Sequence, residues 1–344
     1  MQRLGNLYDR IISLENLRLA DQRARKGKLN TYGVKVHDRH AEEDLLALHE
    51  ALKVGTYKTS EYSTFFIYEP KEREIFRLPY FPDRIVHHAV MNILEPVWVS
   101  VFTADTYSCI KGRGIQAAAD KLRNVIDRDK PGCAYCLKID IRKFYPSIDH
   151  DILKRIVRRK IKDTRLLTLL DEIIDSADGL PIGNYLSQFL ANLMLAYFDH
   201  WVKEVKRVRY YFRYADDIVV LHSEKRFLRG LLADFESYLS TRLCLEVKDN
   251  KQIFPVAKDH KDSTGRGIDF LGYVFYHNET RLRKSIKQNF CRKVAKLKKR
   301  KRPVTEAEFK QTVASWWGWA KHSDSEYFIN KLNKIAPYEI KFKR

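Results

Sequence analysis

Two adjacent aspartates, Asp216 and Asp217, stand inside the stretch RYADDIVVLH, and a third, Asp140, ends the apolar stretch CAYCLKID. Like charges beside apolar strands become tolerable when a divalent cation compensates them. In nucleotidyl transfer, carboxylates from separate strands position two cations about 3.5–4 Å apart, which hold the attacking and leaving oxygens. The three aspartates therefore indicate phosphoryl-transfer chemistry, although aspartate is also common in turns because of its local hydrogen bonds.

Strand and helix patterns surround these aspartates in a definite order. A strand is expected over CAYCLKIDI, and Asp216 and Asp217 fall at the bend between two later strands. The elements expected after the first strand are a helix from about Asp151, a helix near 164–177, a long helix to about Val205, the strands VRYYFRY and IVVLH, a helix over 225–242, and the strand-like segments LEVK, IDFLGYVFY and RLRK. This order is that of a split β-α-β palm.

The residues before the first aspartate predict helices and one hairpin. Residues 1–60 are mainly helical in pattern, with a stop near Gly55. The segment FFIYEPKEREIFRLPYF predicts two strands joined by a charged turn. The next segment, IVHHAVMNILEPVW, predicts a helix that Pro96 ends.

The composition favours a nucleic acid as the partner. The chain has 64 Lys and Arg against 44 Asp and Glu, a formal net charge of +20. Residues 281–302 alone hold twelve Lys or Arg and no acid, in a helical pattern with one apolar stripe. No apolar run approaches the roughly 20 residues of a membrane span, and the charged start does not resemble a signal peptide. We therefore expect a cytoplasmic protein that does not bind membranes.

The cysteines agree with a reducing compartment. There are five of them, an odd number, and only Cys133 and Cys136 lie close together in the sequence. This pair lacks a second pair that would complete a zinc site, and it leads into an apolar strand. We interpret both residues as buried structural thiols.

The motifs around the aspartates resemble those of reverse transcriptases. FRYADDIVVL, preceded by KIDIRKFYPSID, is similar to the family's pair of active-site motifs, and EPKEREI, FPDRIVHHAV, PIGNYLSQFLANL, LEVKDNKQ and DFLGY are similar to further motifs in the family's order. The resemblance covers residues 60–280. It implies an α+β right-hand polymerase with an N-terminal helical extension (1–60), fingers and a palm with a split β-α-β sheet (61–280), and a basic helical thumb (281–344).

The resemblance also implies roles for the acidic residues. Asp140 and Asp216 would bind two Mg²⁺ ions, with Mn²⁺ as an alternative. The backbone carbonyl of Ile141 would help them, and Asp217 would complete the acidic cluster. The chain would then be an RNA-directed DNA polymerase whose ligands are template RNA, a cDNA or primer strand, and dNTPs.

Further residues match the family's nucleotide and primer sites. Tyr145 falls where the family has an aromatic ring that excludes a 2′-hydroxyl. Lys71 and Arg73 lie on the charged hairpin that holds the triphosphate, although such residues are also typical of a solvated turn. Lys251 matches a lysine proposed as general acid to pyrophosphate, with a surface lysine as the alternative. The resemblance places a primer grip at Phe270, Leu271 and Gly272, although a buried strand would use the same residues.

The basic segment that follows would contact the nucleic-acid backbone. The residues expected to do so are Arg283, Lys284, Arg292, Lys293, Lys298, Lys299 and Arg300.

The motif between the aspartates resembles that of one subfamily of reverse transcriptases. Most reverse transcriptases have glutamine before its glycine and proline after its serine, whereas this chain has Ile182 before Gly183 and Gln188 after Ser187. Both departures resemble the reverse transcriptases of diversity-generating retroelements. Isoleucine offers no hydrogen bond near the incoming nucleotide, and the loss of such contacts reduces discrimination between correct and incorrect pairs.

This subfamily resemblance implies a specific biology. The enzyme would copy a template-repeat RNA into cDNA with errors opposite adenine, for mutagenic retrohoming and diversification of a target gene. It would work with a small basic accessory protein, a homopentamer in the family, in a bacterial, archaeal or phage-encoded setting. Two alternatives stay open: a retron-like or group II intron-like reverse transcriptase of ordinary fidelity, and a non-catalytic RNA-binding protein.

Overall fold

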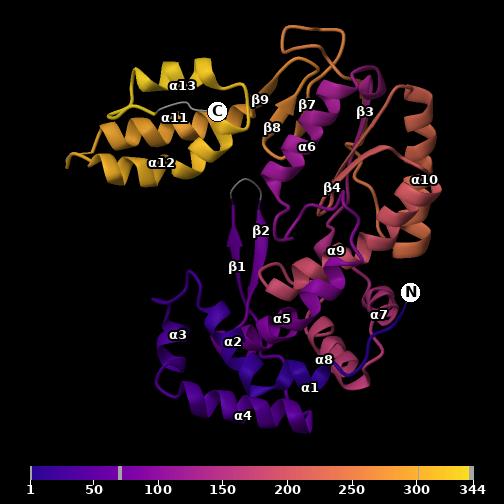
Figure 1. Ribbon diagram of the computed structural model, residues 1–344, viewed down its shortest axis with the longest axis vertical. Helices are drawn as coiled ribbons and strands as arrows, with labels where there is room; N and C mark the ends of the chain where they lie inside the picture. Colours follow the sequence, from indigo (N-terminus) through magenta and orange to yellow (C-terminus); the bar gives the residue numbers. More distant parts are fainter. Residues whose placement is uncertain (1, 69–71, 301, 341–344) are drawn as a thin grey trace. The chain divides into compact units, whose positions relative to one another are not determined.

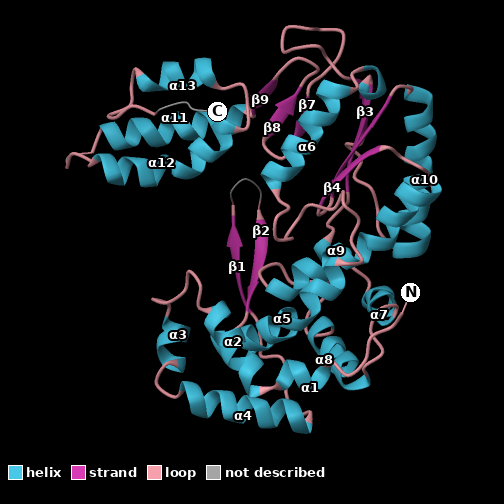
Figure 2. Cartoon of the chain, in the orientation of Figure 1, coloured by secondary structure: helices cyan, strands magenta, loops and turns pink. Residues whose placement is uncertain are grey.

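The computed structural model describes residues 2–68, 72–300 and 302–340. It divides the chain into two compact units, each built from separate stretches of sequence. Unit 1 contains Met1–Cys109, Ile141–Arg207 and Glu236–Val247, and unit 2 contains Ile110–Asp140, Val208–Phe235 and Lys248–Arg344. Figures 1 and 2 trace the elements of both units, in which helices and sheets are mixed as expected for an α+β protein.

Unit 1 is mainly helical. Its elements in chain order are α1 (Tyr8–Ile12), α2 (Leu14–Ala24), α3 (Tyr32–His37), α4 (Ala41–Val54), β1 (Ser63–Ile67), β2 (Arg73–Arg77), α5 (Ile85–Val99), α7 (His150–Arg158), α8 (Thr164–Ile174) and α9 (Tyr185–His200). Helix α5 packs against α2 and α9 and buries Trp98 completely. The helices predicted over residues 1–60 are confirmed. Helix α4 ends where expected, because Gly55 adopts the left-handed conformation (φ 82°) that closes helices.

The predicted hairpin of unit 1 is also confirmed. Strands β1 and β2 pair antiparallel, with Ser63 opposite Arg77 and Ile67 opposite Arg73. All five residues of β1 are exposed, including the aromatic rings of Phe65 and Phe66. Strand β2 is less open to solvent, because Ile75 and Phe76 are half-buried.

Unit 2 contains the sheet that carries the aspartates. Its elements are α6 (Ile115–Arg128), β3 (Tyr135–Asp140), β4 (Tyr210–Tyr214), β5 (Asp217–His222), β6 (Gln252–Pro255), β7 (Ile268–Phe270), β8 (Tyr273–Phe275), β9 (Thr280–Leu282), α11 (Lys284–Lys298), α12 (Glu306–Lys321) and α13 (Glu326–Asn333). Helix α10 (Lys225–Leu243) begins in this unit and ends in unit 1. The main sheet has the antiparallel order β4-β5-β3-β6, and β7, β8 and β9 form a second sheet.

Three details of the sequence prediction are wrong. Helix α5 continues through Pro96 to Val99. The proline removes only one N–H near the helix end, and buried Leu94 and Trp98 hold the last turn against the core. The segment LEVK is not a strand, because Val247 forms only an isolated bridge to Ile141 and the strand β6 begins later.

The third error concerns IDFLGYVFY, which was expected as one strand. Leu271 (φ 51°) and Gly272 (φ 83°) instead form a tight turn between β7 and β8. A side chain on Gly272 would lie 2.6 Å from Ile286 and Trp319, so only glycine fits there. Within the described ranges, no helix is both long and apolar enough to cross a membrane.

Candidate active site

Strand pairing in unit 2 brings the three aspartates together. Asp140 is the last residue of β3, and its register partner is Asp217, the first residue of β5. Asp216 lies in the turn between β4 and β5, as the sequence predicted. A hydrogen bond joins the carboxyl groups of Asp216 and Asp140. Aspartates from two parts of the sequence that lie far apart thus form a cluster of carboxyl groups at one end of the sheet.

The turn before Asp216 is held by a side chain that the sequence analysis missed. Ala215 has a positive φ of 52°, which is unusual for a residue other than glycine. The guanidinium of Arg213, fully buried in β4, donates a hydrogen bond of 3.1 Å to the carbonyl of Ala215. Arginine is rarely buried without such partners, so its position inside a strand was the available signal.

The cluster is electrostatically unfavourable when all three groups are ionised. Burial, together with the charge of Asp140 and the hydrogen bond to it, raises the pKa of Asp216 to about 7. Burial likewise raises the pKa of Asp217 to about 6; Lys138 opposes this rise, and Asp140 adds to it. Asp216 and Asp217 therefore keep their protons to a higher pH than an ordinary aspartate does, and positive charge nearby opposes this shift.

Two lysines supply part of this positive charge. The Nζ atom of Lys248 lies 2.7 Å from Oδ1 of Asp140, and its backbone N–H donates to the Asp140 carbonyl at 2.8 Å. The Nζ atom of Lys138 lies 3.9 Å from Oδ2 of Asp217 and also donates to the backbone carbonyl of Asp269. Lys138 is two residues before Asp140 on the same strand, so the alternation of strand faces could have identified it.

The side chains fit a hard divalent cation. Oxygen atoms of carboxylates are the ligands that Mg²⁺ and Mn²⁺ prefer. Oδ1 of Asp217 is buried without a hydrogen-bond partner, a position that a bound cation would satisfy. In the described part of the chain, however, no three His, Cys, Asp or Glu side chains are already gathered around one ion position, and the Lys248 ammonium contacts Asp140 instead.

Tyr145, Ile182 and Gly183, three of the residues predicted to bind the nucleotide, lie in unit 1. The carbonyl of Tyr145, in a short 3-10 turn, accepts from Leu180 at 2.9 Å. The carbonyl of Ile182 accepts from Phe76 in β2 at 2.8 Å. A side chain on Gly183 (φ 129°) would lie 2.4 Å from the Phe76 carbonyl oxygen.

The other predicted nucleotide residues are less closely grouped. Gln188 is half-buried in the first turn of α9, and Arg73 is exposed at the start of β2. Lys251 is exposed just before β6 in unit 2. Lys71 lies outside the described residues.

The predicted primer grip and basic segment lie together in unit 2. Phe270 is fully buried, while Leu271 and Gly272 form the β7–β8 turn that packs on Ile286 of α11 and Trp319 of α12. Helix α11 buries Phe290, Val294 and Leu297 as the predicted apolar stripe. Of the basic residues predicted to contact nucleic acid, five are exposed: Lys284, Arg292, Lys298, Lys299 and Arg300. Lys293 is half-buried, and Arg283 forms an ion pair with Asp269 at 2.5 Å.

The cysteine prediction is confirmed. Cys133 and Cys136 are completely buried and free of disulfides. Burial raises the pKa of the Cys133 thiol to about 12, so it stays protonated.

Comparison with known families agrees with this site. Residues 70–275 match the family model described as reverse transcriptase (RNA-dependent DNA polymerase). The matched segment covers more than half of the 344 residues and contains all three aspartates. The chain therefore belongs to the reverse transcriptase family of RNA-directed DNA polymerases.

Individual relatives are distant. The chain is 25% identical to protein YkfC of Escherichia coli in an alignment of 262 positions, and the match covers 62% of this chain and 67% of that protein. It is 24% identical over 260 residues to the group II intron-encoded protein LtrA of Lactococcus lactis, covering 70% of this chain and 42% of LtrA. The match thus spans less than half of LtrA.

Similarity to solved structures is low. An apo telomerase from Candida tropicalis, truncated from its C-terminal domain, matches with a TM-score of 0.46 and 11% identity, covering 71% of this chain and 60% of that one.

Proposed function

We propose that Asp140, Asp216 and Asp217 carry the nucleotidyl transfer by which this RNA-directed DNA polymerase extends a DNA strand on an RNA template. The observation that supports this best is the register of the palm sheet, which pairs Asp140 with Asp217 and places Asp216 beside them. Phosphoryl transfer requires mainly positioning and charge neutralisation, and these three side chains would provide both by holding divalent cations.

Two Mg²⁺ ions, with Mn²⁺ as an alternative, would be held by the three carboxylates and the Ile141 carbonyl. When bound, they would neutralise charge on the attacking and leaving oxygens. The chain's own contribution is to hold the oxygen ligands on a rigid sheet edge, where the buried Arg213 fixes the turn. Lys248 would give up its contact with Asp140 as the cation binds.

The remaining predicted residues would position the substrates. We assign the exclusion of ribonucleotides to the ring of Tyr145, and triphosphate contacts to Arg73, Lys71 and Lys251. We assign the primer strand to the β7–β8 turn, and backbone contacts to the exposed cations of α11.

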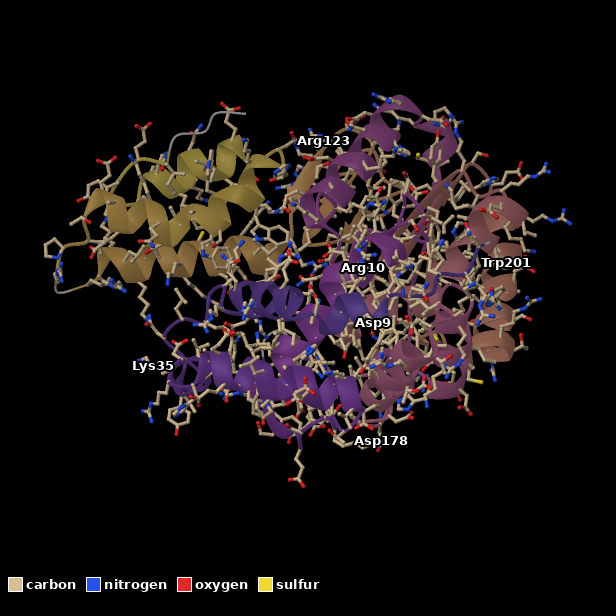
Figure 3. All side chains as sticks on the ribbon, turned by 60° about the horizontal axis from the view of Figure 1, so that its bottom comes forward. Asp9, Arg10, Lys35, Arg123, Asp178 and Trp201 are labelled. Atoms are coloured by element: carbon tan, nitrogen blue, oxygen red, sulfur yellow. The ribbon has the colours of Figure 1, made fainter. Side chains whose placement is uncertain are left out.

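Substitution of one aspartate tests the catalytic assignment. Asp216→Asn should abolish primer extension on RNA in the presence of Mg²⁺, because the amide cannot supply the ligand charge. The matched control is Asp178→Asn, an exposed acid of unit 1 labelled in Figure 3, which should extend primers like the wild type. RNA binding in EDTA, measured for both variants, separates lost catalysis from misfolding.

Extension that survives in Asp216→Asn would contradict the assignment of the metal ligands. If the wild type binds RNA but extends no primer under any tested condition, the non-catalytic RNA-binding alternative would replace the polymerase function.

We further propose that the polymerase is error-prone, of the type found in diversity-generating retroelements, with a small basic accessory protein as partner. Ile182 and Gln188 support this proposal. The relatives support the group II intron-like alternative better. LtrA is described as a group II intron-encoded protein, and the match to it covers 70% of this chain. The two proposals differ in one measurable property, the fidelity of copying template adenines.

Sequencing of the cDNA product distinguishes an error-prone retroelement polymerase from one of ordinary fidelity. The retroelement proposal predicts frequent misincorporation opposite adenine, which Ile182→Gln should lower several-fold by restoring a polar contact. Val54→Gln, at an exposed apolar position of unit 1, is the matched control and should leave the errors unchanged. Faithful copying of adenine by the wild type, with and without the accessory protein, would rule out the retroelement type and leave the alternative, a retron-like or group II intron-like reverse transcriptase of ordinary fidelity.

A further inference from the structure

Lys138, beside the catalytic cluster, joins the two sheets of unit 2. It lies on β3, and its Nζ atom is 3.9 Å from Oδ2 of Asp217. The same ammonium donates a hydrogen bond to the backbone carbonyl of Asp269 in β7. Strand β3 belongs to the four-stranded sheet, and β7 belongs to the three-stranded sheet. One side chain therefore connects the catalytic strands to the sheet that carries the predicted primer grip.

The carboxylate of Asp269 continues this connection to helix α11. Its Oδ1 atom accepts a hydrogen bond of 2.7 Å from Nε of Arg283 and lies 2.5 Å from a second nitrogen of the same guanidinium. Arg283 directly precedes α11, and its backbone N–H donates to the Gly272 carbonyl at 2.9 Å. The β7–β8 turn, the start of α11 and Lys138 therefore meet at Asp269.

The charges of this connection reach the catalytic carboxyl group of Asp217. Burial has the largest effect on the pKa of Asp217 and raises it. The charges of Lys138 and Arg283 lower this pKa, whereas those of Asp140 and Asp269 raise it. Coulomb interactions weaken with distance and with screening by solvent, so Asp269 and Arg283 lie near the catalytic cluster.

The ion pair between Asp269 and Arg283 contributes little to folding stability. The two side chains are 51% and 40% exposed, and solvent screens the attraction between charges of this kind. The sheet around them is held by side chains that are completely buried, such as Phe270 and Tyr273. A substitution at Asp269 can therefore move the β7–β8 turn relative to Asp217 without unfolding the protein.

We propose that Asp269 is a positioning residue, which holds the β7–β8 turn and the start of α11 at a fixed distance from the catalytic carboxylates and so places the end of the primer strand for attack. The proposal rests on the proposed function, in which this turn holds the primer. Arg283, which the sequence predicted as a contact to the nucleic-acid backbone, acts instead through Asp269. A displacement of about 1 Å at the reacting atoms can lower a rate about 100-fold, so a small movement of the turn is sufficient.

Single-turnover primer extension on RNA tests this role. Asp269→Asn keeps the size of the side chain but removes the charge that holds Arg283. Its extension rate at saturating dNTP should fall about tenfold, because the primer end is no longer held in line with the catalytic carboxylates. Its affinity for the primer–template, measured in EDTA, should stay within about twofold of the wild type, and its urea midpoint should be unchanged.

Two further variants separate positioning from a direct contact to phosphate. Arg283→Gln should lower the extension rate by a similar factor, and the double variant should be no slower than either single variant, as expected for residues that act through one contact. Asp269→Glu, which keeps the charge, should recover most of the rate. The matched control is Lys310→Gln, which breaks an ion pair of 2.6 Å with Glu306 on α12 of the same unit and should extend primers like the wild type.

The position of the primer end can also be measured without polymerisation. Fe²⁺ in place of Mg²⁺ generates hydroxyl radicals at the catalytic carboxylates, and these radicals cut the nearest nucleotides of an end-labelled primer. The wild type should cut the terminal nucleotides of the primer. Asp269→Asn should cut them more weakly and over a wider stretch, at equal occupancy of the primer–template.

Several outcomes would overturn the positioning role. They are an unchanged rate or cutting pattern in Asp269→Asn, an equal loss of rate in Lys310→Gln, and a loss of rate that is matched by an equal loss of primer–template affinity. The last result would make the pair a direct nucleic-acid contact. If the wild type extends primers and Asp216→Asn does not, while Asp269→Asn is normal, only the positioning role fails. If the wild type neither extends nor cuts the primer, the proposed function fails as well.

Discussion

The carboxyl group of Asp216 makes the stability of the protein without metal depend on pH. Its pKa is about 7 in the folded state, against 3.8 for an ordinary aspartate. A pKa raised by folding contributes stability that is complete below about pH 4 and is lost as pH rises through about 7. We expect the wild type in EDTA to lose about 2 kcal/mol of unfolding free energy from this group between about pH 5 and about pH 8.

Urea unfolding of Asp216→Asn checks this expectation. The amide does not ionise, so the variant should lack this part of the pH dependence and should be more stable than the wild type at about pH 8 in EDTA. Mg²⁺ should remove most of that difference by binding the wild-type carboxylates. Asp178→Asn serves as the control, and parallel pH profiles for wild type and Asp216→Asn would contradict the assignment.

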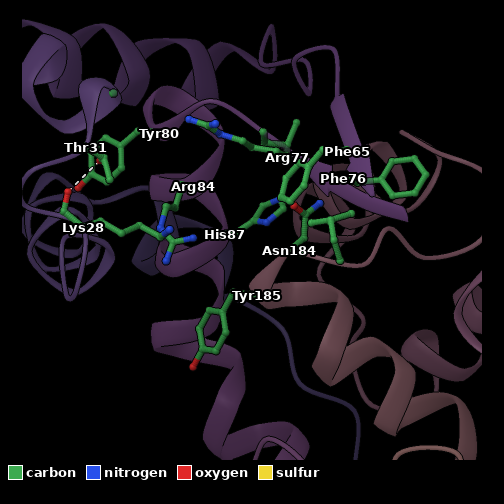
Figure 4. A pocket seen from close by; sticks show the side chains of 14 residues that line it. Lys28, Thr31, Phe65, Phe76, Arg77, Tyr80, Arg84, His87, Asn184 and Tyr185 are labelled. Carbon is green, nitrogen blue, oxygen red and sulfur yellow. Dashed lines mark hydrogen bonds between the residues drawn. The ribbon is translucent and has the colours of Figure 1, made fainter. Parts of the chain in front are cut away.

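Individual residues also show the limits of sequence reasoning. Asp140, Asp216 and Asp217 could be predicted because like charges beside apolar strands are rare without a function. Lys248 could not, because its contact with Asp140 depends on a turn after α10 that has no regular period. Lys28, Arg77 and Arg84 come from three segments, and the tertiary structure brings them together around one cavity of unit 1 (Figure 4).

At the scale of elements, the contact between the β1–β2 hairpin and the segment before α9 depends on Gly183. An added methyl group would lie 2.4 Å from the Phe76 carbonyl oxygen, and a φ of 129° is unfavourable for any other residue. Gly183→Ala should therefore destabilise the protein by about 1–3 kcal/mol in urea unfolding.

A second glycine gives the matched control. Gly230 is exposed in α10, and a Cβ there would meet no atom within 4 Å. Gly230→Ala should stabilise the protein by up to about 1 kcal/mol, because alanine is the better helix former. Equal effects of the two substitutions would show that Gly183 is not constrained by its contact.

Elements with a clear period were predictable, and those set by backbone detail were not. Strand β3 and the pair β4 and β5 follow from apolar runs that end at charged residues. The turn at Leu271 and Gly272 was missed because the hydrophobic run continues through it. Pro96 was misread as a helix end because core packing outweighs one lost hydrogen bond.

For the whole molecule, the net charge of +20 predicts a polyanionic partner but not where it binds. Basic residues gather at two places, on helix α11 and around one cavity of unit 1. Helix α11 presents exposed cations around a buried apolar stripe. A cavity of about 410 Å³ in unit 1 is lined by three further cations, Lys28, Arg77 and Arg84. Binding of a polyanion to the exposed cations of α11 should weaken steeply as the salt concentration rises.

The pairing of Asp140 with Asp217 also determines where this chain can change in length during evolution. Side chains alternate between the two faces of a strand, so one residue gained or lost within Tyr135–Asp140 would turn the carboxylate away from its partner. The exposed segment 258–264, between β6 and β7, lies outside the ladder and can absorb such changes. Insertions and deletions should therefore accumulate among homologues in this loop and be purged from both strands.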